Sequence, residues 1–120
     1  RPCLKDIGMI KRISLLTRKP HLTHEEFVKH WREIHGPLAI GVPGLRRYVQ
    51  SHIQSESERS DIQTTDIQVD GIAELWYDDE ASMAKASASP EAQRLFADGA
   101  LIIGQIKTFV IKEEVIIDDA

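Results

Sequence analysis

The order of strand-like and helix-like segments predicts an α+β fold, a ferredoxin-like βαββαβ plait. Four short stretches are rich in Ile, Leu, Val and aromatic residues, and a helical pattern follows the first and the third of them. A polar stretch without aromatic residues, 55–68, separates the second strand from the third and predicts a surface loop. At 120 residues the chain has the length of one domain, expected over 9–117 after an N-terminal extension of residues 1–8.

Alternation of apolar and polar residues places the strands. The expected strands are 9–17, 45–53, 72–77 and 105–111, or 105–117 if the alternation is followed to Ile117. Their chemistry adds a second prediction. In the third strand, Ile72 and Trp76 share one face while Leu75 and Tyr77 share the other, so both faces are apolar. A sheet covered by helices on one face alone should be polar on its other face, so we expect the second face to be buried in a homodimer.

Capping residues and prolines predict where the helices begin and break. Thr23 followed by Glu26 forms the sequence pattern of a capping box, so the first helix begins there. Gly36-Pro37 should interrupt or kink this helix, because proline lacks an N–H and clashes with the preceding turn. The second helix is expected over 79–96 with a break near Ser89-Pro90.

The first helix carries the histidines of greatest interest. At about 100° per residue, a core stripe forms from Phe27, Trp31, Ile34 and Leu38. His30 and His35 fall on opposite flanks of that stripe, where helix meets sheet and where an imidazole can titrate near neutral pH. A flanking histidine is more often a hydrogen-bonded packing residue, and this is the favoured interpretation of His30. His35 precedes Gly36-Pro37, and irregular backbone beside a titratable group is a common setting for a site.

The second strand adds a candidate hydrogen-bond donor. Tyr48 and His52 lie on the same face of this strand, and if that face looks toward the helices, Tyr48 can bind a carbonyl or enolate oxygen while His35 moves a proton. Glu74 lies among apolar residues and needs either an arginine partner, Arg12 or Arg47, or a raised pKa. Large apolar side chains would form the walls of a site for a flat substrate, although each is also a core candidate: Phe27, Trp31, Trp76, Met83 and Phe96.

Composition excludes several classes of protein. The net charge of −4 argues against nucleic-acid binding, and no apolar run is long enough to cross a membrane. No signal-peptide pattern opens the chain, and the single cysteine, Cys3, excludes an internal disulfide, so a cytoplasmic protein is expected. Phosphate-binding and serine-hydrolase motifs are absent, and the histidine spacings do not indicate a metal site. No cofactor is expected, although a haem held by one histidine stays open.

Several separated motifs resemble the EthD family of dimeric α+β barrel proteins. They are HW-x(3)-HGPLA over 30–39, Pro43-Gly44-Leu45 with Tyr48, and DGIAELWYDDEASM over 70–83. The resemblance implies a pocket between sheet and helices. The sequence is similar also to methylmuconolactone methylisomerases, which place a histidine where His35 falls and a tyrosine where Tyr48 falls. Those enzymes carry a cysteine in a Glu-Cys-Trp run where this chain has Leu75, so a thiol-dependent mechanism is not expected here.

Three functional hypotheses follow. The first is a cofactor-independent acid/base enzyme, an isomerase, cyclase or lyase, acting on a small apolar carbonyl, lactone or phenolic compound in a catabolic or secondary-metabolic pathway. The second is a non-catalytic accessory protein that binds such a ligand. The third is a haem- or oxygen-dependent monooxygenase.

Overall fold

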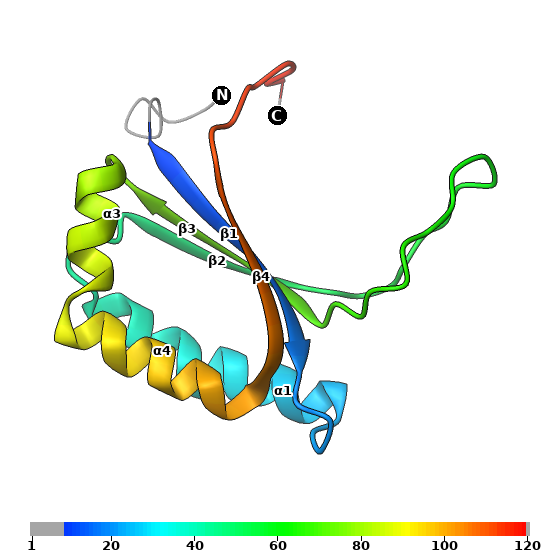
Figure 1. Cartoon of the computed structure of the whole chain (residues 1–120), viewed down its shortest axis with the longest axis horizontal. Helices are drawn as coiled ribbons and strands as arrows, with labels where there is room; N and C mark the ends of the chain where they lie inside the picture. The colour runs from blue at the N-terminus through cyan, green and yellow to red at the C-terminus, as the bar shows by residue number, and fades with distance from the viewer. Residues whose placement is uncertain (1–8, 120) are drawn as a thin grey trace.

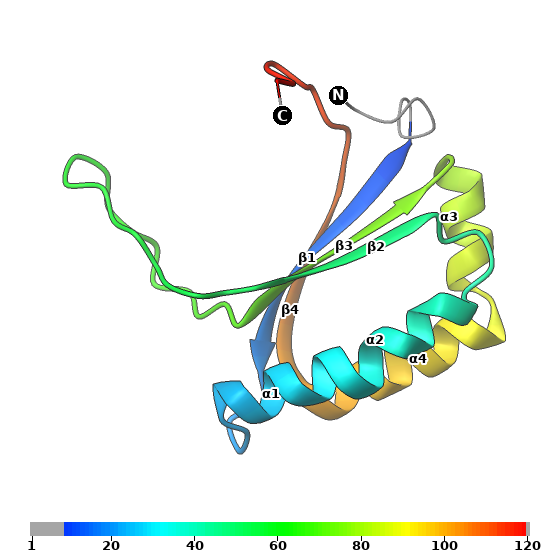
Figure 2. The ribbon, with the colours of Figure 1, turned by 180° about the vertical axis from the view of Figure 1, so that it is seen from behind.

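The computed structural model of the chain describes residues 9–119, and its four strands form one antiparallel sheet. The strands are β1 (Ile10–Arg18), β2 (Arg47–His52), β3 (Gly71–Tyr77) and β4 (Ile103–Ile111), in the spatial order β2-β3-β1-β4. The main helices α1 (His24–His30), α3 (Glu80–Ser87) and α4 (Pro90–Ile102) cover one face of this sheet (Figures 1 and 2). The expected α+β class and ferredoxin-like βαββαβ plait are therefore confirmed. The expected N-terminal extension and Cys3 lie outside the described residues.

The strand boundaries are close to the expected ones, and the helices differ more. α4 continues to Ile102 rather than ending at Phe96, and β4 follows it without a loop and ends at Ile111. The break between α3 and α4 is confirmed, because the Ser89 side chain accepts a hydrogen bond from the Ala92 N–H and Pro90 occupies the first helical position. Residues 53–70 form the extended arm between β2 and β3 (Figure 1). Across 9–119, no helix has the length and apolar character needed to span a bilayer.

The first helix begins as expected but does not break at Gly36-Pro37. Thr23 and Glu26 form both bonds of the capping box. After α1 the helix widens into a π-helical segment, η2 (Trp31–His35), and continues through α2 (Gly36–Leu38) and η3 (Ala39–Gly41). The Gly36 N–H bonds to the Trp31 carbonyl five residues earlier. The extra residue in this turn accommodates Pro37 without ending the helix, so the expectation of an interruption is corrected to a π-bulge.

The π-helical turn changes which side chains of this helix are buried. Trp31, His35 and Ala39 are buried, whereas Ile34 is 54% exposed and Leu38 is 36% exposed. The expected core stripe through Ile34 and Leu38 is therefore wrong, because a regular 100° spacing does not hold across a wider turn. The wider turn carries His35 from the flank of the helix into the interior.

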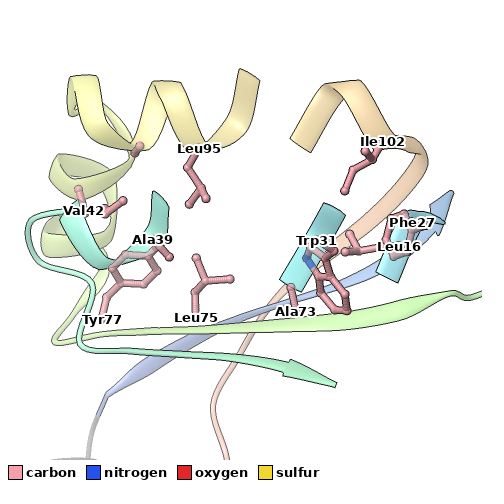
Figure 3. Packing of buried hydrophobic residues seen from close by; sticks show 12 residues of the cluster. Leu16, Phe27, Trp31, Ala39, Val42, Ala73, Leu75, Tyr77, Leu95 and Ile102 are labelled. Carbon is pink, nitrogen blue, oxygen red and sulfur yellow. The ribbon is translucent and has the colours of Figure 1, made fainter. Parts of the chain in front are cut away.

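The core lies between the sheet and the helices (Figure 3). Trp31 and Phe27 are fully buried, with ring centroids 5.6 Å apart. The Trp31 indole lies directly over Gly71, where a β-carbon would come within 2.5 Å of the ring. The absence of a side chain at Gly71 therefore determines how closely η2 approaches the sheet.

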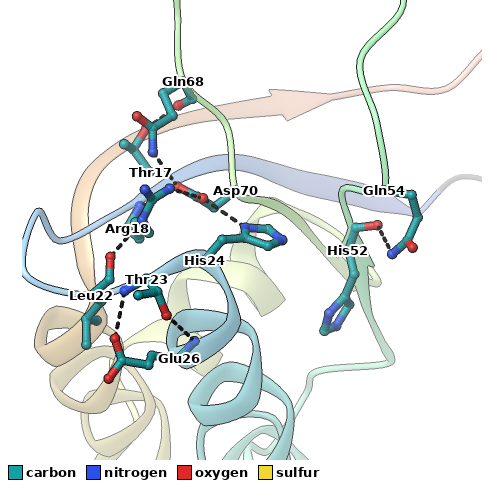
Figure 4. Close-up of polar contacts among 10 residues, drawn as sticks. All are labelled: Thr17, Arg18, Leu22, Thr23, His24, Glu26, His52, Gln54, Gln68 and Asp70. Atoms are coloured by element: carbon teal, nitrogen blue, oxygen red, sulfur yellow. Dashed lines mark hydrogen bonds and ion pairs between the residues drawn. The ribbon is translucent and has the colours of Figure 1, made fainter.

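A buried carboxylate joins the start of α1 to the end of β1. Asp70, 2% exposed, accepts bonds from the Arg18 backbone N–H at 2.8 Å, the Arg18 guanidinium at 2.7 Å and the His24 Nδ1 at 3.0 Å (Figure 4). Burial opposes the charge of Asp70, but these bonds outweigh it and hold its pKa below the ordinary value. This cluster stabilises the corner of the fold beside the first helix.

Candidate active site

A cavity of about 460 Å³ lies between the sheet and the helices. β1, β3 and β4 supply its floor, while η2 and α4 supply its roof. Most of its lining side chains are apolar, which suits a small organic ligand. The residues around it are Arg12, Ser14, Leu16, Trp31, His35, Tyr48, Ala73, Leu75, Leu95, Phe96, Gly99, Ala100, Ile103, Ile106 and Thr108.

His35 enters this cavity from η2 and is held by a carboxylate on α4. Its Nδ1 lies 2.9 Å from Asp98, whose other oxygen lies 3.0 Å from the Nε2 of His30. A carboxylate only accepts, so each of these two imidazole nitrogens donates its proton to Asp98. The Nε2 of His35 is then the unprotonated nitrogen in the neutral ring and is free to act as a base.

Burial sets the protonation state of His35. The residue is 8% exposed, and desolvation lowers its pKa below the ordinary value of 6.5, although the bond to Asp98 opposes this shift. His35 is thus neutral at neutral pH. Gly99, on α4, allows the imidazole to lie close to the helix, since a β-carbon there would come within 3.2 Å of the His35 Cε1.

Tyr48 projects from β2 into the same cavity and is oriented by Gln50. The Gln50 Nε2 donates to the Tyr48 hydroxyl at 2.9 Å and to the Trp31 carbonyl at 2.7 Å. Its Oε1 accepts from His52 at 3.0 Å, and the His52 ring packs on Trp31 with centroids 4.8 Å apart. Burial raises the pKa of Tyr48, so its hydroxyl stays protonated and can donate a hydrogen bond.

A polar wall lies on the β1 and β4 side. The hydroxyls of Ser14 and Thr108 are 2.8 Å apart and both residues line the cavity. Arg12 lines it as well, with its guanidinium 3.1 Å from the Ser87 hydroxyl and 5.7 Å from the Tyr77 ring centroid. Arg12 is the one cationic side chain among the described residues that line this cavity, and it provides attraction for an anionic group.

The structure brings four of the candidate residues together and places the others elsewhere. His35, Tyr48, Trp31 and Phe96 line the cavity. His30 reaches it only through Asp98. Three other candidates lie on the helix side of the sheet but outside the cavity lining. Phe27 and Met83 belong to the core, and His52 lies behind Trp31.

Glu74 and Trp76 lie on the open face of the sheet, which corrects two sequence expectations. Glu74 binds Lys11 at 2.5 Å, a cation that the sequence did not single out as its partner. The side chain of Trp76 lies between cations, with the Lys11 Nζ 4.8 Å from its ring centroid. Strand alternation explains this placement, because Leu75 faces the cavity and its two neighbours must face the other way.

Asp98 and Arg12 are components of the site that were not expected from the sequence. Asp98 lay beyond the expected end of the second helix, yet the apolar spacing of Leu95, Gly99 and Ile102 extends the helical period across it. That period was the available signal. Within the described part of the chain, no three His, Cys, Asp or Glu side chains converge in the manner of a metal site.

Comparison with known proteins places the chain in a family. The EthD domain model matches residues 19–104. This range includes all the helices together with β2 and β3, whereas β1 and most of β4 lie outside it. This chain belongs to the EthD family. The resemblance noted from the HGPLA and Pro-Gly-Leu motifs is thereby confirmed.

Relatives of this EthD protein include an enzyme and several solved structures. A 4-carboxymethyl-4-methylbutenolide mutase from Pseudomonas reinekei is 29% identical over 88% of this chain and 98% of its own length. An EthD family protein from Bacillus halodurans has a TM-score of 0.71 and 23% identity, covering 88% of this chain and 99% of that chain. A dimeric protein of ferredoxin-like fold from Bacteroides fragilis has a TM-score of 0.66 and 14% identity, covering 88% and 97%.

Proposed function

We propose that this EthD protein is a cofactor-independent acid/base enzyme of the isomerase type that acts on a small lactone. The observation that carries the proposal is the pair formed by His35 and Asp98 at the wall of an apolar cavity, opposite a protonated Tyr48. A neutral imidazole oriented by a carboxylate is suited to removing a proton and returning it at another position. The sequence similarity to a butenolide mutase supports the lactone as the substrate class.

The residues divide the reaction between them. The Nε2 of His35 takes a proton from the exocyclic CH2 of a carboxymethyl-substituted butenolide. The electron pair of the broken C–H bond forms a C=C bond, and the ring C–O bond breaks, so that negative charge develops on the lactone carbonyl oxygen as it becomes part of a carboxylate. Tyr48 donates a hydrogen bond to that oxygen and stabilises the charge that develops on it. The carboxylate then adds to another C=C carbon while the proton on His35 returns to the adjacent carbon, so no net proton, electron or co-reactant is required. Asp98 stabilises the imidazolium between the two transfers.

Arg12 favours a lactone that carries an acidic substituent. The cavity is otherwise apolar, so a carboxylate of the ligand would lie toward the guanidinium at the β1 wall. Leu75 lies in the wall at the position of the cysteine of methylmuconolactone methylisomerases, so the reaction proposed here uses no thiol.

The experiment follows proton transfer directly. 4-Carboxymethyl-4-methylbutenolide is incubated with the protein in D₂O, and deuterium entry at carbon and any rearrangement are followed by NMR. We expect the wild type to catalyse exchange and His35→Gln to be slower by about 100-fold or more. His21→Gln, at an exposed histidine far from the cavity lining, is the matched control and should match the wild type. Binding without exchange would overturn the catalytic proposal and favour a ligand-binding accessory protein.

The proposed enzyme is also a homodimer that joins its sheets through their open faces. Apolar side chains from three strands lie on this face, among them the half-buried Leu15 and Val49 and the exposed Phe109. The dimeric relative of the same fold supports this arrangement. Phe109→Glu should yield a monomer in light scattering, whereas Ile40→Glu, at an 88% exposed position of the helical layer, should not. A wild type that scatters as a single chain at micromolar concentration would contradict the dimer.

A further inference from the structure

One polar atom in the cavity wall lacks a partner. The Trp31 side chain is fully buried, and its indole Nε1–H has no hydrogen-bond acceptor among residues 9–119. Trp31 lines the cavity, and Figure 3 shows its nitrogen on the side of the ring that faces Leu75 and Leu95, two other lining residues. The unpartnered donor therefore lies at the wall of the cavity, beside the Tyr48 hydroxyl.

An unsatisfied indole at this depth is unusual for a folded protein. Buried tryptophan N–H groups normally find an acceptor, because leaving one unpaired loses the hydrogen bond that water supplied. Trp76, the other tryptophan of the chain, shows the ordinary case, since its Nε1 donates to Glu113 at 3.3 Å. Gln50 binds the backbone carbonyl of Trp31 and does not satisfy its indole.

The Tyr48 hydroxyl is a second donor in the lining of this cavity. Its oxygen already accepts a hydrogen bond from Gln50, so its own proton remains to be donated. The Trp31 indole N–H is close enough to the Tyr48 oxygen to act on it as a weak donor, which opposes the burial-driven rise in the tyrosine pKa, but the contact falls short of hydrogen-bond geometry and leaves the N–H without a full partner. Two donors on different elements, η2 and β2, thus converge on one wall of the cavity.

We propose that the Trp31 Nε1–H and the Tyr48 O–H together bind one acceptor oxygen of the ligand, the lactone carbonyl if the function proposed above is correct. A two-donor arrangement of this kind stabilises an oxygen more strongly as negative charge develops on it. Trp31 would therefore act on the same oxygen as Tyr48 while His35 handles the proton. This assigns a hydrogen-bonding role to a residue that otherwise contributes only apolar surface to the cavity wall.

The test uses the two indole N–H signals of the ¹⁵N-labelled wild-type protein, assigned with Trp76→Phe. Two probes with an acceptor oxygen are added separately: 4-carboxymethyl-4-methylbutenolide and 4-nitrophenolate. The cyclic ether obtained by removing the butenolide carbonyl is the matched control ligand. We expect the Trp31 indole proton to move downfield with the butenolide and not with the ether, while the Trp76 signal stays in place.

The outcomes separate this inference from the proposed function. Butenolide binding that moves the signals of other cavity residues but not the Trp31 indole overturns the inference and leaves the lactone substrate class intact. A Trp31 shift with nitrophenolate, when the butenolide moves no cavity signal at all, supports the donor pair and counts against the lactone. If neither probe moves the Trp31 indole, the donor pair is refuted.

An isosteric substitution supplies a second readout. Replacing Trp31 with β-(3-benzothienyl)alanine keeps the size of the ring system and removes the N–H. Loss of one hydrogen bond to a neutral carbonyl should weaken butenolide binding by about 3- to 10-fold and leave binding of the ether unchanged. The same replacement at Trp76, on the open face of the sheet, is the control. Equal affinity of the Trp31 variant and the wild type for the butenolide would overturn the proposal.

Discussion

Gly71→Ala adds one carbon atom at the contact between β3 and the helix that carries His35. A β-carbon at this position would lie 2.5 and 2.7 Å from two carbons of the Trp31 ring, where ordinary contacts are 3.4–4 Å. Trp31 has little freedom to move, because Phe27 and His52 pack on it. Relief of the overlap needs a displacement of about 1 Å, and overpacking of this size costs roughly 1–3 kcal/mol. We expect the free energy of unfolding to fall by about 2 kcal/mol.

The matched control is Gly41→Ala, because a β-carbon at Gly41 meets nothing within 4 Å. Both variants gain the same small entropic benefit of replacing glycine, so their difference isolates the clash with Trp31. Urea unfolding followed by far-ultraviolet circular dichroism measures both, at one protein concentration because association contributes to stability. Gly71→Ala within about 0.5 kcal/mol of Gly41→Ala would refute the packing argument, since that is the scale of an ordinary surface change.

Three further predictions address the site and the fold around it. Gly99→Ala should keep or slightly raise thermal stability, because alanine favours a helix interior. The new β-carbon would lie 3.2 Å from the His35 Cε1, so it should displace the imidazole and slow deuterium exchange roughly tenfold. An unchanged exchange rate would contradict this prediction. In the wild type, the exchange rate should fall only at pH values below 6.5, because burial lowers the pKa of His35. Asp98→Asn removes the group that raises this pKa, so the acid limb of the pH profile of kcat/KM should move to still lower pH. A limb that moves to higher pH would refute the assignment of His35 as the base. Asp70→Asn should lower the free energy of unfolding at pH 7 by about 2 kcal/mol. Because folding lowers the pKa of Asp70, the contribution of its charge to stability is present at pH values above the ordinary pKa of 3.8 and is lost as the pH falls through the folded-state pKa. The difference in free energy of unfolding between variant and wild type, measured by chemical denaturation, should therefore shrink in acid. A difference independent of pH would exclude a role for the charge.

The fold could be predicted because its signals are local. Strand alternation, the capping box of Thr23 and Glu26 and the break at Ser89-Pro90 each depend on a few neighbouring residues. The same alternation placed Tyr48 and His52 on one face of β2, and the structure shows that this face looks toward the helices. At Gly36-Pro37 local rules predicted an interruption or a kink of the helix but not the π-helical turn that the chain uses, because they assume one helical pitch.

The partners of the candidate residues could not be predicted in the same way. Asp98 is 63 residues away from His35 in sequence, and Lys11 is equally distant from Glu74. Each pairing depends on how helices and strands pack, not on the composition of either segment. Glu74 illustrates the point, since an arginine partner or a raised pKa was expected for it, and only the sheet register brings Lys11 to its side.

The residue order alone determines the succession of strands and helices, the caps and the two apolar faces of the sheet, because these follow from the backbone preferences and alternation of adjacent residues. Tertiary structure decides that His35 is buried, that Asp98 holds its Nδ1 and that the Trp31 N–H faces the cavity unpaired. These features arise where η2, α4 and the sheet meet, and the free energy of a buried polar group depends on which distant group, if any, lies beside it.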